Sequence, residues 1–205
     1  KDVQNWEGAF EGEGTLPIPG YRHRLSTVES NTLSDDQCAD FFSMLAESQR
    51  PLIYAGGGVI NGNATEALRT FSRTFGVPGV TTLMGLGGLD TTDPLCLHML
   101  GMHGTAFANY AVEDCDLLIA VGARFDDRVT GKISEFATGA KIIHIDIDPT
   151  AIGKNVPVDV PVVGDAKNVL HEVNKLVKRQ KRTVWRKHVD NLKEKFPLTF
   201  ETAEG

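Results

Sequence analysis

The sequence predicts an α/β fold in which helices cover both faces of a doubly wound, six-stranded parallel sheet. Short segments such as 51–55 and 117–121 are apolar without alternation, as expected of strands that are buried on both faces. Segments with a helical pattern separate these apolar runs, and this alternation is typical of domains built from β-α-β units. Glycine, hydroxyl, arginine or carboxylate residues follow the runs, which places polar chemistry at one edge of the sheet.

The elements can be placed in order along the chain. The first helix is expected to begin after Ser34, which can form a capping box with Gln37, and to end at about Glu47. Strands are expected at 51–55, 79–82, 117–121, 141–146 and 160–163. Further helices are expected at about 64–75, 105–112 and 132–137, and from about 166 onward. We count five or six strands and predict six, in a Rossmann-like arrangement.

The 205 residues are enough for one well-cored domain with extensions. We expect an extended linker over 1–33, the α/β domain over 34–178, and a charged helix or linker over 179–205 that leads towards a further domain. Because the first residue is Lys1 and not methionine, we expect a domain of a larger protein. The basic tail could form a nucleic-acid face, but a solvated helix is the stronger interpretation, since aromatic residues do not interleave with its charges.

The composition narrows the functional class. Apolar residues make up 41% of the chain and charged residues 23%, which is usual for a globular domain. The net charge of −6 argues against nucleic-acid and acidic-membrane partners, and no apolar run is long enough to span a membrane. Three scattered cysteines do not form a disulfide framework, so we expect a reducing compartment.

The segment 122–132, Gly-Ala-Arg-Phe-Asp-Asp-Arg-Val-Thr-Gly-Lys, is the most informative part of the sequence. It directly follows a predicted strand, and open α/β sheets bind ligands at the carboxyl ends of their strands. Arg124 and Arg128 can fork onto phosphate or flavin oxygens, and Asp126 and Asp127 can hold the arginines in place. The alternative is a surface loop in which these side chains form ion pairs with one another.

A glycine-rich turn, Gly56-Gly57-Gly58, follows the first predicted strand. Backbone amides and the helix dipole at a strand-to-helix turn favour a pyrophosphate group. The match to the dinucleotide-binding fingerprint is loose, because Gly62 comes one residue late and no acid follows the second strand to grip the ribose of NAD. A tight turn with close helix packing explains the glycines equally well.

Two carboxylates follow later strands. Asp146 closes the strand at 141–146, and Asp165 comes soon after the strand at 160–163. A carboxylate at either position can accept hydrogen bonds from ribose hydroxyls or an adenine amine, although capping of a helix is the default role of Asp165. Together with the glycine turn and the arginines, these acids predict an extended ligand, longer than a mononucleotide, across the sheet edge.

The residues themselves indicate no metal-binding or catalytic site. His98 and His103 are five residues apart, off the helical spacing that would pair them on one face. His144 lies inside a predicted strand, where a satisfied core histidine is the expected role. The sequence contains no Gly-x-Ser-x-Gly elbow and no Walker loop.

Several segments carry a close resemblance to a known family. They are Thr-Leu-Met-Gly-Leu-Gly at 82–87, Leu-His-Met-Leu-Gly-Met-His-Gly at 97–104, Ala-Asn-Tyr-Ala at 108–111, the segment 122–132, and His-Ile-Asp-Ile-Asp at 144–148. From residue 1 to about 173 the chain resembles the central FAD-binding domain of the catalytic large subunit of acetohydroxyacid synthase (acetolactate synthase), a thiamine-diphosphate-dependent enzyme. The resemblance implies that the whole enzyme condenses two 2-keto acids, pyruvate with pyruvate or 2-ketobutyrate, in branched-chain amino-acid biosynthesis.

The resemblance implies FAD contacts at many of the strand ends. The implied positions are Gly57, Thr82, Leu83, Leu100, Gly101, Met102, His103, Gly122, Ala123, Arg124, Phe125, Asp126, Arg128, Asp146, Ile147, Asp165 and Ala166. Lys1, Met102, Asp127 and Arg128 match positions near the substrate channel, where inhibitors bind in the family.

The resemblance also implies what other parts of the enzyme supply. Thiamine diphosphate and Mg²⁺ are expected on two flanking domains, so these 205 residues alone should hold no catalytic residue. Gly164-Asp165-Ala166, with Asn191 downstream, imitates the metal–diphosphate motif but lacks its last glycine. The implied partners are the flanking domains, further copies in a homodimer or homotetramer, and a regulatory subunit, with neither nucleic acid nor membrane. The implied location is the bacterial cytoplasm or a plastid.

Three alternatives stay open at this point. The domain could belong to a sister thiamine enzyme such as glyoxylate carboligase. It could be an NAD(H)-binding domain such as that of a transhydrogenase, although the missing ribose acid argues against this. It could also be a spacer that binds no cofactor, in which Arg124 and Arg128 would serve as ion-pair partners.

Overall fold

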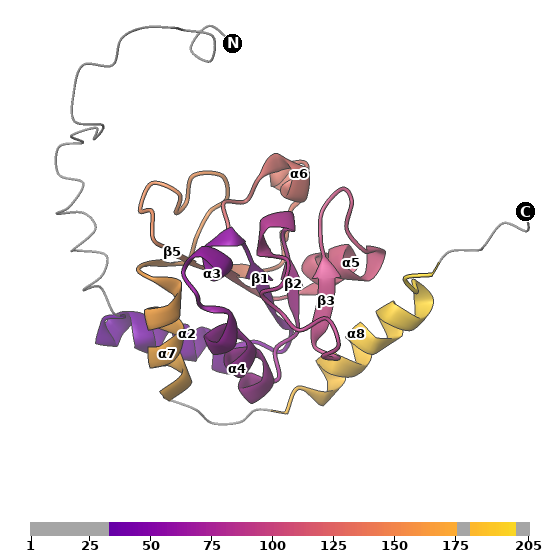
Figure 1. The fold of residues 1–205 in the computed structure, drawn as a ribbon, viewed down its shortest axis with the longest axis horizontal. Helices are drawn as coiled ribbons and strands as arrows, with labels where there is room; N and C mark the ends of the chain where they lie inside the picture. The colour runs from indigo at the N-terminus through magenta and orange to yellow at the C-terminus, as the bar shows by residue number, and fades with distance from the viewer. Residues whose placement is uncertain (1–32, 176–180, 200–205) are drawn as a thin grey trace, which may run out of the picture.

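A computed structural model describes residues 33–175 and 181–199 and shows an open sheet enclosed by helices (Figure 1). All strand pairs are parallel, in the order β3-β2-β1-β4-β5-β6. The strands are β1 (Pro51–Ala55), β2 (Gly79–Thr81), β3 (Cys96–Met99), β4 (Leu117–Val121), β5 (Lys141–Asp146) and β6 (Val160–Val163). The predicted fold class is confirmed, and the strand order reverses between β1 and β4, which is the switch point where doubly wound folds bind ligands.

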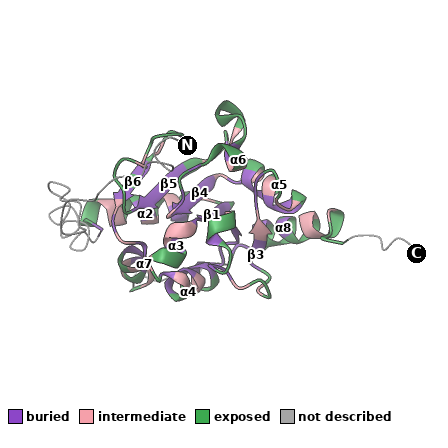
Figure 2. Cartoon of the chain, turned by 45° about the horizontal axis from the view of Figure 1, so that its top comes forward, coloured by how far each residue is buried: buried purple, intermediate pink, exposed green. Residues whose placement is uncertain are grey.

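Helices cover both faces of the sheet. One face carries α2 (Asp35–Glu47), α4 (Thr65–Phe75) and α7 (Ala166–Lys175), and the other carries α5 (Ala106–Asp114) and α8 (Thr183–Lys195). The strand residues alternate between the two cores: Ile53 packs with the first group and Leu52 with the second. Figure 2 shows the strands buried and the outer sides of the helices exposed.

Short helical elements lie near the carboxyl ends of the strands. They are α3 (Gly57–Asn61), the 3₁₀ turn η1 (Leu83–Gly85), α6 (Asp127–Thr130) and the 3₁₀ turn η2 (Ile133–Glu135). None of the helices in the described part of the chain combines the length and the apolar character that a bilayer span requires.

Most of the predicted elements are confirmed. The strands expected at 51–55, 117–121, 141–146 and 160–163 are present, and the one expected at 79–82 ends at Thr81. The capping box at the start of α2 is also present, because the Ser34 hydroxyl accepts a hydrogen bond from the Gln37 amide and the Gln37 side chain accepts one from the Ser34 amide.

Two local expectations need correction. The sequence predicts six strands but places only five; the sixth, β3, is a short edge strand whose pairing with β2 is irregular, and His98 within it has a φ of 60°. The helix expected at 132–137 is only the turn η2, and the helix α6 comes earlier. It starts there because the Asp126 carboxylate accepts a hydrogen bond from the Arg128 amide and so caps it, and it ends at Gly131, whose φ is 58°.

The charged tail packs against the domain through α8. The Trp185 side chain is only 1% exposed, and its ring nitrogen donates a hydrogen bond to the Pro51 carbonyl oxygen at 2.9 Å. Arg182, 8% exposed, donates to the carbonyl oxygens of Leu45 and Phe75, near the ends of α2 and α4. Arg186, Lys187 and Lys195 of α8 are exposed, whereas Lys193 is half-buried and donates a hydrogen bond to the Pro94 carbonyl, so a solvated face and a packed face coexist on this helix.

Candidate functional site

A cleft of about 500 Å³ opens at the carboxyl ends of β1, β4 and β5, at the switch point of the sheet. Its volume falls within the range of about 300–1,000 Å³ that is usual for ligand and cofactor sites. The lining residues are Tyr54, Gly56, Gly57, Gly58, Asn61, Thr82, Leu83, Met84, Gly122, Ala123, Arg124, Asp126, Arg128, Val129, Asp146, Asp148 and Ala151.

The glycine turn after β1 lies directly against the turn after β4. The Gly58 amide donates a hydrogen bond to the Gly122 carbonyl oxygen at 3.0 Å, and a Cβ on Gly58 would lie 2.6 Å from the Gly122 Cα. Gly122 also has a φ of 58°, which side chains rarely adopt. Close packing therefore explains Gly58 and Gly122, although both line the cleft, as does Gly57, where a Cβ would lie 3.0 Å from the Met84 Cβ.

Arg124 and Arg128 both reach the cleft with exposed side chains. Within residues 33–175 and 181–199, no carboxylate lies within 4.0 Å of either guanidinium group. The ion pairs that could have joined them to Asp126 and Asp127 are not formed. The backbone hydrogen bond from Arg128 and further polar contacts lower the pKa of the Asp126 carboxyl, which is occupied with capping α6.

Asp146 and His144 form a buried polar pair behind the cleft. Asp146 is 8% exposed, burial raises the pKa of its carboxyl, and its Oδ1 accepts a hydrogen bond from the Asp148 amide at 2.9 Å. His144 is fully buried, and burial lowers the pKa of its imidazole. Its Nε2 lies 2.8 Å from the Ala123 carbonyl oxygen, which can only accept, so Nε2 carries the proton of the neutral ring. His144 is thus a core histidine as predicted, but its Nδ1 has no partner among the described residues.

A second pocket, of about 410 Å³, lies between the turn after β3, α5 and α6. Leu100, Gly101, Met102 and Asp127 line this pocket and not the cleft. Arg128 lines both, and its backbone carbonyl accepts a hydrogen bond from the Met102 amide on the side of the second pocket.

The remaining candidates from the sequence lie outside both hollows. Phe125 is buried in the core, Ala166 is buried at the start of α7, and Asp165 accepts a hydrogen bond from the Asn168 amide at 3.0 Å as the cap of that helix. His103 and Ile147 are exposed on the surface. Lys1 lies outside the described residues.

The structure adds cleft residues that the sequence did not single out. Asp148 and Ala151 come from the long loop between β5 and β6, and Tyr54 comes from β1. The pair Asp146 and Asp148, spaced by two residues after a strand, was a usable signal for this wall. Tyr54 had no such signal, because it sits within an apolar run.

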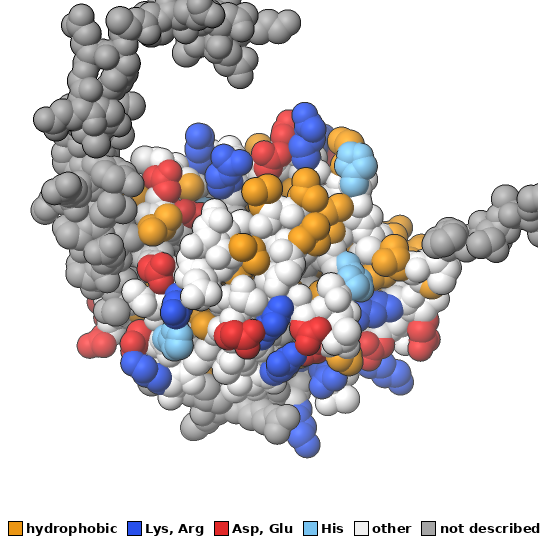
Figure 3. Space-filling view, viewed as in Figure 1, with side chains coloured by type: hydrophobic (Ala, Val, Ile, Leu, Met, Phe, Trp, Pro, Cys, Tyr) orange, Lys and Arg blue, Asp and Glu red, His pale blue; other side chains and the backbone are white. Residues whose placement is uncertain are grey.

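Two exposed methionines lie beside the charged residues at the two hollows, Met84 at the cleft and Met102 at the second pocket. Met84 and Met102, after β2 and β3, are 72% and 73% exposed. On the face drawn in Figure 3, hydrophobic side chains gather in the upper half, with both basic and acidic side chains above them. No group of three or more histidine, cysteine or acidic side chains in the described ranges could hold a metal ion.

Comparisons with known proteins extend these observations. The family model described as thiamine pyrophosphate enzyme, central domain, matches residues 38–173. The chloroplastic acetolactate synthase of Arabidopsis thaliana is 43% identical over 208 residues, which cover 98% of this chain and 30% of the relative. The probable acetolactate synthase large subunit of Methanocaldococcus jannaschii is 51% identical over 176 residues, 84% of this chain and 29% of the relative. The acetolactate synthase large subunit of Parasynechococcus marenigrum is 47% identical over 175 residues, 83% of this chain and 28% of the relative. The chain thus spans about 30% of the length of the relatives that it matches over 98% of its own length.

Proposed function

The chain belongs to the thiamine pyrophosphate enzyme family as its central domain, and from this premise we propose that it is the FAD-binding central domain of an acetolactate synthase (acetohydroxyacid synthase). The whole enzyme would condense pyruvate with a second 2-keto acid. In this proposal, thiamine diphosphate and Mg²⁺ are held by flanking domains of the same subunit, and the enzyme works as a homo-oligomer with a regulatory subunit in the bacterial cytoplasm or a plastid. The role of this chain is to hold FAD.

The observation that carries the FAD proposal is the pair of arginines, Arg124 and Arg128, that face the switch-point cleft. Within the described residues their guanidinium groups have no carboxylate partner, so their donors stay available to a ligand. A guanidinium group matches two oxygens of a phosphate at once, and a dinucleotide carries two phosphates. A charged pair left open at a ligand-binding edge thus supports recognition of a pyrophosphate.

The other walls suit the remainder of an extended dinucleotide. The Asp146 carboxylate can accept hydrogen bonds from sugar hydroxyls, and Gly57, packed against Met84 of η1, lines the cleft beside them. When bound, FAD would supply a flavin ring, which has no net redox role in this proposal. Arg128, shared by the two hollows, would lie where the ligand passes from one to the other.

The rival functions are less well supported. A domain for NAD would need a carboxylate after β2, but Thr82 and Leu83 stand there and begin the turn η1. A spacer would use Arg124 and Arg128 in ion pairs, and the described residues provide none for either.

Titration with FAD, followed by flavin fluorescence and thermal shift, tests the proposal, with NAD as the control ligand. We expect saturable binding of FAD, a rise in melting temperature with FAD, and neither effect with NAD. The same titration on a chain extended upstream of Lys1 serves as a second arm. Binding of NAD without FAD, or no FAD binding in either chain, would contradict the proposal.

A further inference from the structure

The segment that carries the arginines is fixed through its backbone carbonyls. The Gly122 carbonyl accepts from the Gly58 amide at 3.0 Å, and the Ala123 carbonyl accepts from His144 Nε2 at 2.8 Å. The Asn155 side-chain amide donates to the next two carbonyls, those of Arg124 at 2.9 Å and Phe125 at 3.1 Å. Four successive carbonyl oxygens are thus each held by a donor from another part of the chain.

This bracing holds a backbone conformation that residues with side chains rarely adopt. Phe125 has a φ of 52° and is only 2% exposed. Its ring packs at 5.1 Å between centroids against both Tyr54 and His144. A left-handed residue of this kind persists only where its surroundings compel it. The inward turn of Phe125 leaves its neighbours Arg124 and Asp126 on the cleft side of the chain.

We propose that His144 and Asn155 are positioning residues, which hold the carbonyls of residues 123–125 so that Arg124 and Asp126 face the cleft. Neither would contact the ligand itself: Asn155 does not line the cleft, and the bonded nitrogen of His144 points to the backbone. Both come from β5 and the loop that follows it, so this part of the chain braces the turn after β4. The effect on a ligand rests on the proposed binding of FAD, whereas the effect on the backbone does not.

Asn155 gives the sharper test, because its side chain is exposed and its loss should not unfold the domain. We would compare Asn155→Ala with Asn191→Ala, a control at an exposed asparagine of α8 that makes no side-chain hydrogen bond in the described residues. Hydrogen exchange of the peptide over 122–130, without ligand, reports on the backbone directly. We expect exchange about tenfold faster in Asn155→Ala and unchanged in Asn191→Ala, since two hydrogen bonds are lost only in the first.

His144 is tested by a pair of substitutions at one position. His144→Phe fills the site without a donor, whereas His144→Gln retains a donor for the Ala123 carbonyl. We expect His144→Phe to speed the exchange and to weaken FAD binding about tenfold, and His144→Gln to restore part of both.

The two hypotheses fail in different ways. If neither the unmodified chain nor the chain extended upstream of Lys1 binds FAD, the proposed function fails, and exchange alone then decides on the positioning role. If exchange over 122–130 in both Asn155→Ala and His144→Phe equals that of the unmodified chain, the positioning role is refuted, whatever the affinity for FAD.

Discussion

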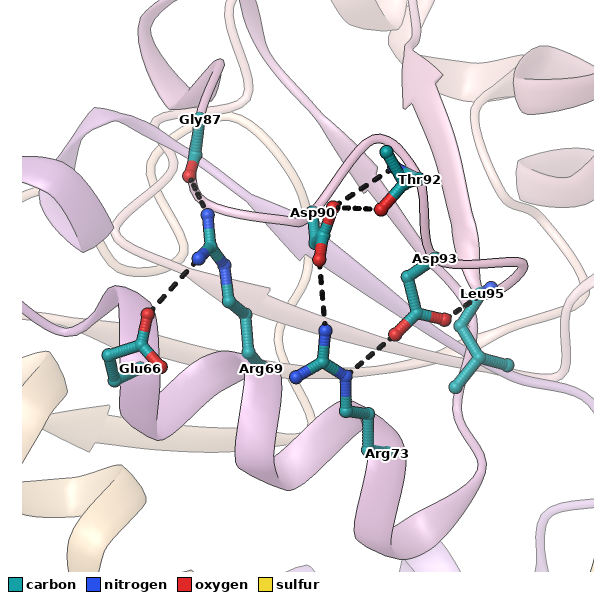
Figure 4. A network of polar contacts seen from close by, with 8 residues as sticks. All are labelled: Glu66, Arg69, Arg73, Gly87, Asp90, Thr92, Asp93 and Leu95. Carbon is teal, nitrogen blue, oxygen red and sulfur yellow. Dashed lines mark hydrogen bonds and ion pairs between the residues drawn. The ribbon is translucent and has the colours of Figure 1, made fainter.

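Two pairs of arginines in this domain differ in what surrounds them. Arg69 and Arg73 lie on α4 and bind the loop that leads to β3, as Figure 4 shows. The Arg73 side chain forms ion pairs with Asp93 at 2.7 Å and Asp90 at 3.1 Å. Arg124 and Arg128, at the carboxyl edge of the sheet, have no carboxylate at such a distance among the described residues.

The two regions differ in how close the local acids lie to the guanidinium groups. In the α4 network, Asp90 and Asp93 are fixed by the Thr92 and Leu95 amides, and one oxygen of each carboxylate still faces Arg73. At the sheet edge, one oxygen of Asp126 caps α6, and among the described residues neither Asp126 nor Asp127 comes within ion-pair distance of Arg124 or Arg128. An arginine whose neighbours are already arranged around it supports the fold, whereas an arginine left open beside a cleft is available to a ligand.

A third arrangement, that of Arg182, should give the largest effect on stability. Its buried guanidinium holds the Leu45 and Phe75 carbonyls, which Arg182→Ala would leave without a donor. We expect the free energy of unfolding in urea to fall by about 2–4 kcal/mol. The affinity of the remaining folded protein for FAD should stay unchanged, since Arg182 lies outside the cleft. A loss of affinity in Arg182→Ala would break the distinction between arginines of the fold and arginines of the site.

Substitution of Arg124 should affect the ligand and not the fold. We expect Arg124→Ala to weaken FAD binding by about 1–3 kcal/mol, because a charge-assisted fork onto phosphate is lost. Arg124→Lys should lose part of this, since lysine keeps the charge but not the fork. Fluorescence titration gives the affinities, and a thermal melt without ligand provides the control, which should be nearly unchanged. Unaltered flavin occupancy would remove Arg124 from the site.

Asp93→Asn removes the negative charge that pairs with Arg73 and so tests the contribution of this ion pair. The ion pair with Arg73 is partly exposed, so we expect a loss of about 0.5–1 kcal/mol in the free energy of unfolding. The loss should shrink at high salt, and FAD affinity should not change. A change in affinity above twofold would show that the α4 network supports the cleft.

A smaller effect is expected on the free energy of unfolding when the pH is lowered, because His144 and Asp146 are buried. Burial lowers the pKa of His144 from its ordinary value of 6.5, so the folded state favours the neutral ring. Its stabilising contribution is therefore complete above pH 6.5 and is lost as the pH falls through the lowered pKa. Burial raises the pKa of Asp146, which gives the opposite slope.

Melting temperatures between pH 7 and pH 5 check this expectation. The unmodified chain should lose more stability on acidification than His144→Gln, which keeps Asp146 but cannot protonate at position 144. If the melting temperature falls equally between pH 7 and pH 5 in both proteins, the assigned role of His144 in the acid sensitivity is contradicted.

Most of the fold could be predicted from the sequence, because the central strands are buried on both faces and therefore form continuous apolar runs. β1, β4 and β5 were placed residue by residue for this reason. β3 was not, because an edge strand of four residues with an irregular register leaves little periodic signal. The start of α6 depended on the Asp126 cap, which a sequence rich in aspartate and arginine does not single out.

The candidate site was accessible only in part. Parallel strands bring their carboxyl ends to one edge, so Gly57, Arg124 and Asp146 could be expected to meet, and all three line the cleft. The side on which each residue of a turn lies could not be deduced. Phe125 points inward because of its positive φ, and Asn155 reaches the turn from a loop with no regular pattern.

The most direct test of the central claim compares two double variants by calorimetric titration with FAD. Arg124→Ala combined with Arg128→Ala removes the open pair, and Arg69→Ala combined with Arg73→Ala removes the paired one. We predict that the first loses FAD binding by at least about 100-fold with little change in melting temperature. The second should bind FAD as the unmodified chain does, with a lower melting temperature. Equal FAD affinity in both double variants would contradict the claim that the open arginines form the cofactor site.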